Sequence, residues 1–351
     1  MADRALPEAR LSELLELAER AASTALTGDY EPVAGELRKA DAELETAILQ
    51  LLAARRTADA MKLIVGAHSH WIDAGRAADG QRLAETALAE ADGVGAIDAV
   101  LRNRTMLTAS ETAFRQGDQE SATTWAAAAI ESAAADDPVT AALAEVSLAR
   151  IAFRDGDAPR IESLSRAALE RAGEDLKVQR AAYHMLAWAA HTAGDRNAAL
   201  DWFERSLAVR QAMADPFGVA VELANLGDMA MEAGDLPRAA ASIREALATA
   251  VRLDNLYLLT SLIGSAGALS GAVGDAEEAL TLLAAAETAY ATTSLVPDPG
   301  GREMLDAAAA SARQAVTPSR ADAATATGNR LSVQAAARRA MKTCERLMKR
   351  A

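Results

Sequence analysis

The sequence predicts an all-α protein, an α-solenoid of about seven helical hairpins followed by a C-terminal capping helix. Three observations indicate this. Turns centred on glycine recur from Gly28 to Gly274, and successive glycines are separated by 47, 42, 39, 38, 40 and 40 residues. Apolar residues between the turns recur every three or four positions, as on one face of a helix. No stretch shows the sustained alternation of apolar and polar residues that is typical of a strand. The nearly constant period predicts hairpins stacked side by side.

The clearest repeat runs from residue 181 to residue 207, AAYHMLAWAAHTAGDRNAALDWFERSL. Gly194 can adopt the left-handed conformation that ends many helices, and Asp195 can accept hydrogen bonds from the amide groups that begin the next helix. The residues expected on the two packing faces are Tyr183, Leu186, Ala187, Ala190, Ala199, Phe203, Ser206 and Leu207. Because aromatic residues make up only 3% of the chain, we expect an interior of small side chains between closely packed helices.

The other elements follow in order along the chain. Residues 33–54 predict an unusually long helix, and helices at 61–74 and 79–92 follow it, which explains the 47-residue first spacing. Residues 255–274 carry no charge and are long enough to raise the question of a membrane span. Glycines interrupt this stretch, and it falls in register as the first helix of the seventh hairpin, so we expect a buried solenoid helix. The remaining turns are expected at Gly28-Asp29, Gly75-Arg76, Gly117-Asp118, Gly156-Asp157, Gly234-Asp235 and Gly274-Asp275.

The C-terminal part differs in charge from the rest. Prolines break the helices at residues 297–301 and again at Pro318, with one more helix expected at 303–316. We therefore expect a solenoid over residues 1–316 and a short linker with a basic helix over residues 317–351. That last segment holds eight Lys or Arg and two acidic residues, although the whole chain carries a net charge of −14. The basic helix either caps the last hairpin or docks on a partner, an acidic membrane surface or nucleic acid.

The composition and the absence of motifs narrow the function classes. The only cysteine, Cys344, excludes an internal disulfide, and the opening residues MADRALPEAR contain no apolar export segment, so we expect a cytoplasmic protein. There is no phosphate-binding G-x-x-x-x-G-K-[ST] loop, no G-x-S-x-G and no H-E-x-x-H. His68 and His70 would point in different directions on a helix. We expect no enzyme, no cofactor and no metal site.

Two segments resemble a known family. Residues 37–89, LRKADAELETAILQLLAARRTADAMKLIVGAHSHWIDAGRAADGQRLAETALA, resemble the start of the helical-repeat region of large bacterial transcriptional regulators of the AfsR and LuxR-type ATPase class. Residues 279–316 and the following ATGNRLSVQAAARRA resemble its end, and the hairpins between look like tetratricopeptide repeats. The resemblance implies the sensing or docking arm of such a regulator. It does not extend to an ATPase or a DNA-binding domain, because neither motif is present.

One face of the first helices, opposite their packing stripe, is the candidate binding surface. In stacked hairpins the first helices line the concave side, where partners bind. The residues expected there are Arg104, Glu111, Phe114, Arg115, Arg150, Phe153, Arg154, His184, Trp188, His191, Asp228, Met231 and Glu232. The aromatic side chains would anchor a partner, the arginines would hold an anion, and the acidic residues would set the polarity at one end. Alternatively, the aromatic residues simply pack against the next helix.

Three functions are compatible with these features of the sequence. The first is a protein-interaction scaffold that holds a peptide or helix in the groove. The second is an effector sensor, in which the same groove holds a small molecule, and a closed pocket around Trp188 would favour it. The third and weakest is nucleic-acid contact through the basic tail, which predicts a steep salt dependence. A homodimer is compatible with each of these functions.

Overall fold

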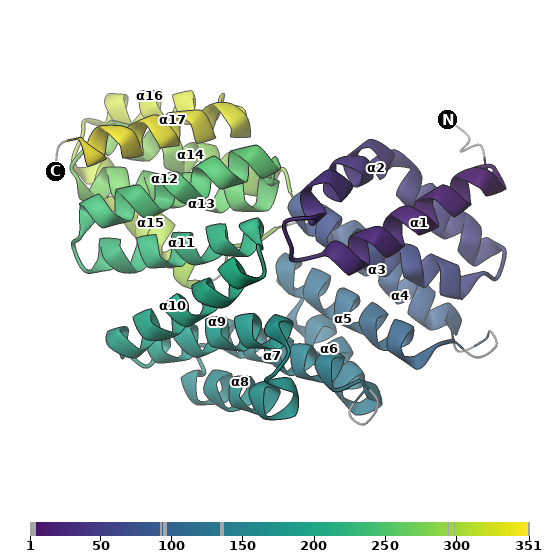
Figure 1. The fold of residues 1–351 in the computed structure, drawn as a ribbon. Coiled ribbons are helices and arrows are strands. Elements are labelled where there is room, and N and C mark those ends of the chain that lie inside the picture. The colour runs from purple at the N-terminus through teal and green to yellow at the C-terminus, as the bar shows by residue number, and fades with distance from the viewer. Residues whose placement is uncertain are drawn as a thin grey trace. The chain divides into compact units, whose positions relative to one another are not determined.

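A computed structural model describes residues 5–91, 93, 97–133, 137–293, 295–297 and 299–349. Within these ranges the chain forms seventeen α-helices and no strand, so the predicted all-α hairpin architecture is confirmed (Figure 1). The chain divides into two compact units. The first unit comprises residues 1–72 and 76–215, and the second comprises residues 216–351 with 73–75.

The first unit contains five consecutive helix pairs. Their bounds are α1 (Glu8–Thr24), α2 (Tyr30–Ala53), α3 (Thr57–Asp73), α4 (Ala77–Ala91), α5 (Ala99–Gln116), α6 (Gln119–Ala133), α7 (Pro138–Arg154), α8 (Ala158–Ala172), α9 (Leu176–Thr192) and α10 (Arg196–Ala212). Small residues allow close packing between these helices. A Cβ atom at Gly66 of α3 would lie only 2.5 Å from the Cα of Ala18 in α1. Alanine and glycine thus allow the helices to approach closely, although the core between them also buries many leucine side chains, such as Leu14, Leu37 and Leu44.

The turns follow the predicted pattern at six of the seven glycines. The backbone is left-handed at Gly75, Gly117, Gly156, Gly194, Gly234 and Gly274, where φ lies between 70° and 83°. After every one of these glycines except Gly75, an aspartate begins the second helix. The carboxylate of Asp195, for example, accepts a hydrogen bond from the Ala198 N–H at 3.0 Å. Such side-chain caps satisfy amide groups that would otherwise have no partner at the start of a helix.

The first predicted turn is wrong in its details. The left-handed residue is Leu26, with φ of 70°, and not Gly28. Asp29 precedes α2 but makes no side-chain cap hydrogen bond. The reason is that α1 ends at Thr24, so the chain reverses direction before it reaches Gly28.

The second unit contains α11 (Pro216–Glu232), α12 (Leu236–Leu253), α13 (Leu256–Ala272), α14 (Ala276–Ala291), α15 (Pro299–Gln314), α16 (Pro318–Gly328) and α17 (Val333–Met348). The uncharged stretch forms α13, which packs against α12, α14, α15 and α17. It is the buried solenoid helix that its register predicted. Among the described helices, none has both the length and the apolar character that crossing a bilayer requires.

The basic C-terminal helix α17 lies on the second unit itself. It packs against α12, α13 and α14, and Figure 1 shows it beside them. Its inner face buries Ala337, Ala340 and Cys344. Arg339 donates to both carboxylate oxygens of Glu278 in α14, with the shortest distance 2.5 Å, and the Thr343 hydroxyl donates to the same carboxylate at 2.8 Å. One apolar face and one charge-assisted contact thus hold the helix in place.

Candidate binding surface on the first helices

Polar side chains connect three successive first helices of the first unit. Glu111 on α5 lies between His68 on α3 and Arg150 on α7. Its Oε1 accepts a hydrogen bond from the Arg150 Nη1 at 2.6 Å, and its Oε2 lies 3.1 Å from the His68 Nε2. About one fifth of each of these side chains is exposed. We call His68, Glu111 and Arg150 the polar ladder.

The ladder holds Glu111 in its charged form. Burial alone would raise the pKa of this carboxyl group, but the Arg150 charge and the hydrogen bond with His68 more than offset that effect. The net result is a pKa well below its ordinary value of 4.5. Such a shift requires a partly desolvated site in which opposite charges are close together. The ladder therefore links neighbouring hairpins electrostatically as well as by apolar packing.

Phe114 on α5 is a packing residue between hairpins. Its side chain is 5% exposed and lies in a buried cluster with Ala122 and Ile151. The guanidinium carbon of Arg154 lies 4.3 Å from the centre of the Phe114 ring, and that of Arg115 lies 5.8 Å away. These distances are within the range of cation–π contacts. The alternative interpretation, an aromatic residue packed against the next helix, thus describes Phe114.

Trp188 is at the centre of an aromatic cluster. Its ring centre lies 4.7 Å from that of Phe153 on α7 and 5.4 Å from that of the fully buried Phe203 on α10. His191 is 5.4 Å away, and the Trp188 Nε1 donates to the Nε2 of His184 at 3.2 Å. Trp188 therefore lies in the seam between α7, α9 and α10 with one part still exposed. The sequence predicted that these residues are neighbours, but it placed Trp188 opposite the packing face.

Three of the candidate residues belong to the second unit, on α11. Asp228 is the most perturbed of them. Burial raises its pKa to about 7, a weak hydrogen bond from Ser265 lowers it slightly, and the neighbouring Glu232 raises it further. Its Oδ1 is buried and has no hydrogen-bond partner among the described residues. Met231 packs at the edge of the core of the second unit.

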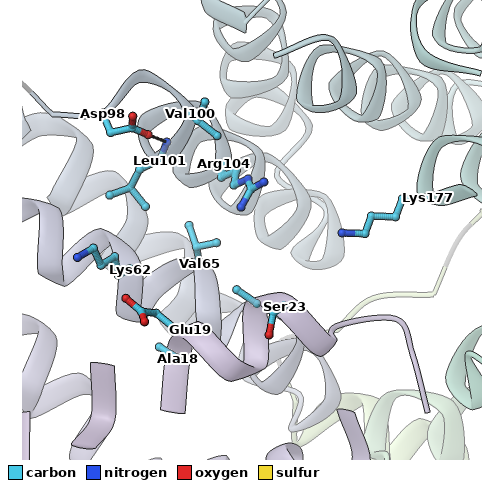
Figure 2. A pocket seen from close by; sticks show the side chains of 11 residues that line it. Ala18, Glu19, Ser23, Lys62, Val65, Asp98, Val100, Leu101, Arg104 and Lys177 are labelled. Atoms are coloured by element: carbon cyan, nitrogen blue, oxygen red, sulfur yellow. Dashed lines mark hydrogen bonds between the residues drawn. The ribbon is translucent and has the colours of Figure 1, made fainter. Parts of the chain in front are cut away.

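Arg104 lies apart from the other candidates and lines a cavity of about 370 Å³ in the first unit. Figure 2 shows this cavity between α1, α3, α5 and α9, with the Arg104 and Lys177 side chains at its edge. Lys62 also lines the cavity, and neither Lys62 nor Lys177 was predicted as a binding residue from the sequence. Trp188 is not one of the lining residues.

The histidine pair at residues 68 and 70 separates as the helical geometry predicted. His68 faces Glu111, whereas His70 lies 2.7 Å from the Asp41 Oδ1 on α2. Burial lowers the pKa of His70, and the Asp41 carboxylate counteracts part of that effect. Among the described residues, no group of three or more His, Cys, Asp or Glu side chains has an arrangement suited to a metal ion.

Comparisons with known proteins agree with this architecture. Residues 140–212 match the family model described as tetratricopeptide repeat. The match covers α7 to α10, the helices that carry Arg150 and the Trp188 cluster. The fold is thus a tetratricopeptide-like solenoid. No curated protein matches the chain.

Several solved structures share the fold. A Rap protein complexed with Competence and Sporulation Factor is 11% identical with a TM-score of 0.63, over 100% of this chain and 90% of that chain. The Rap conjugation gene regulator of the plasmid pLS20, in complex with the Phr* peptide, is 11% identical with a TM-score of 0.55. The match covers 88% of this chain and 97% of that chain. Aspartyl phosphate phosphatase F from Bacillus subtilis is 11% identical with a TM-score of 0.52. The match covers 90% of this chain and 96% of that chain. At such identities the likeness concerns the fold alone.

Proposed function

We propose that this chain is a regulatory protein-interaction scaffold. It binds a peptide or a helix of another protein on the first helices of its first unit. The fold supports this proposal, since stacked hairpins present a continuous face built from successive first helices. Two of the solved proteins with the same fold are complexes with a peptide or a sporulation factor.

The polar ladder is the observation that carries the proposal. His68, Glu111 and Arg150 come from three successive hairpins and remain partly exposed, so one extended segment lying across α3, α5 and α7 can reach all three. A carboxylate of the partner would compete with Glu111 for Arg150, and a basic group would compete with Arg150 for Glu111. Either exchange alters a contact between hairpins. Binding on this face is therefore coupled to the way in which the hairpins pack.

The regulatory part of the proposal rests on the resemblance of residues 37–89 and 279–316 to the repeat region of bacterial transcriptional regulators. In such proteins the repeats receive a signal and an attached domain acts on DNA. In our proposal, the chain passes its signal through protein contact to another polypeptide that carries the switch or DNA-binding domain.

The test compares the wild type with Arg150→Gln in the polar ladder and Arg154→Gln beside it, which keep the size of the side chain but remove the charge. A partner captured from a lysate of the native cell is identified by mass spectrometry, purified and titrated calorimetrically. We expect each variant to bind about tenfold more weakly, because a lost charge-assisted contact costs about 1.5 kcal/mol. The matched control is Arg166→Gln on α8, where an exposed arginine pairs with Glu162 on its own helix. Equal affinity of all four proteins, with unchanged helicity, would refute the proposed surface.

A further inference from the structure

The cavity in the first unit has an apolar floor and a basic rim. Its floor comes from Ala18 and Ala22 on α1, Val65 on α3, and Val100 and Leu101 on α5. Lys62, Arg104 and Lys177 approach it from three different helices, as Figure 2 shows. A volume of about 370 Å³ is at the lower end of the range for small-ligand sites. The cavity therefore has room for a short apolar group with a charged end.

Two of the three cations at this cavity have no ion pair within the described residues. Lys62 lies 3.4 Å from Asp59, whereas neither Arg104 nor Lys177 has a carboxylate partner in the part of the chain that the structure describes. By contrast, Arg56, Arg76 and Arg150 each lie 2.6 Å from a carboxylate oxygen. Arg104 and Lys177 thus bring two cations without a carboxylate partner from different helices to one cavity.

Two carboxylates also line this cavity, but neither forms an ion pair with Arg104 or Lys177 within the described residues. The Asp98 carboxylate caps α5 and accepts a hydrogen bond from the Leu101 N–H at 2.9 Å. Glu19 is the other. Lys177 also lies in the first turn of α9, where the helix dipole disfavours a cation. Asp175 caps this helix end by accepting hydrogen bonds from the Lys177 and Val178 N–H groups, so a bound anion would compensate the charge of the lysine side chain.

We propose that this cavity binds a carboxylate attached to a short apolar group. The carboxylate lies between Arg104 and Lys177, and the apolar group lies against Val65 and Leu101. Two kinds of ligand carry such a group: a free small acid and the C-terminal residue of a peptide. The inference is independent of the proposed partner surface, since the cavity does not include the polar ladder.

The probes are N-acetyl-leucine and a pentapeptide that ends in leucine with a free carboxylate. Each is titrated calorimetrically into the full chain, and the corresponding amides serve as neutral controls. We expect at least one acid to bind with a dissociation constant of about 1 mM or less. Its amide should bind about tenfold more weakly, because the charge-assisted hydrogen bonds are lost. Binding of the free acid alone identifies a small molecule, and binding of the peptide alone identifies a peptide terminus.

Variants then assign the binding to this cavity. Arg104→Ala and Lys177→Ala should each weaken binding about tenfold, and Arg104→Lys should retain most of it. Lys39→Ala on α2 is the matched control, since this exposed lysine does not line the cavity. Thermal unfolding verifies that each variant is folded. Absence of saturable binding by both acids, equal affinity for acid and amide, or an equal loss in the Lys39→Ala control would each overturn the proposal.

Discussion

Asp228 should make the second unit less stable as the pH rises through neutrality. The carboxylate lies on α11, and its buried Oδ1 has no hydrogen-bond partner among the residues that the structure describes, whereas Oδ2 accepts a long hydrogen bond of 3.5 Å from the Ser265 hydroxyl. In the unfolded chain the pKa is 3.8, and in the folded chain burial raises it to about 7. Between these two values the folded chain binds a proton that the unfolded chain does not. The free energy of unfolding therefore falls with increasing pH over this interval.

The size of the effect follows from the same two pKa values. Each pKa unit between 3.8 and about 7 corresponds to about 1.4 kcal/mol, so the full contribution is about 4 kcal/mol. Asp228→Asn keeps the shape of the side chain but cannot ionise. The variant should match the wild type in stability near pH 4 and exceed it by up to about 4 kcal/mol at pH 8.

The assay must report on the second unit alone. All four tryptophans of the chain, Trp71, Trp125, Trp188 and Trp202, belong to the first unit, so their fluorescence during urea unfolding serves as an internal reference. Hydrogen exchange of peptides from α11 and α13, corrected for the intrinsic pH dependence, reports on the second unit.

The matched control is Glu245→Gln, which neutralises an exposed carboxylate on α12. Protection of α11 should decline from pH 6 to pH 8 in the wild type and in this control, but not in Asp228→Asn. If all three proteins show the same pH dependence, Asp228 does not titrate in this range and the reasoning from its burial is wrong.

Three further results are expected. Glu111→Gln should lower the unfolding free energy of the first unit by about 2 kcal/mol at pH 7, measured by tryptophan fluorescence in urea, because Arg150 loses its carboxylate partner. Since the pKa of Glu111 is lowered, only the wild type should lose this stabilisation as the pH falls below 4.5. Gly66→Ala places a Cβ atom against the Ala18 backbone and should accelerate hydrogen exchange in α1, whereas unchanged exchange would contradict the close approach. Burial raises the pKa of Cys344 to about 12, so a thiol reagent should react with it only on unfolding. Rapid labelling of the native chain would contradict the docking of α17.

The hairpin architecture could be predicted because each repeat carries its own local signal. Glycine in the left-handed conformation and an aspartate that caps the next helix act over a few residues, and the structure has both where the sequence predicted them, from Gly117 to Gly274. The exception is the first turn. Leu26 adopts a conformation that costs energy for a residue with a side chain, and no local pattern indicates that this position would accept it.

The pairing of charges was harder to predict than the helices. Glu111 and Arg150 each lie six residues before the glycine of their own turn, so the sequence placed them at equivalent positions in adjacent hairpins. Whether two such side chains meet depends on the offset between neighbouring hairpins, which one repeat does not encode. Lys62 and Lys177 were missed for a related reason. They lie on α3 and α9, far apart in the sequence, and only the stacking of several hairpins brings them to one cavity.

The two proposed sites of the first unit would respond differently to an incoming anion. At the polar ladder, a carboxylate must displace Glu111 from Arg150, so one ion pair replaces another and the number of paired charges does not change. At the cavity, Arg104 and Lys177 have no carboxylate partner to displace among the described residues, so binding creates new ion pairs. Screening by salt weakens newly formed, partly exposed pairs more than an exchange of one pair for another. Affinity at the cavity should therefore depend on ionic strength, whereas affinity at the ladder should depend mainly on how well the partner segment fits across α3, α5 and α7.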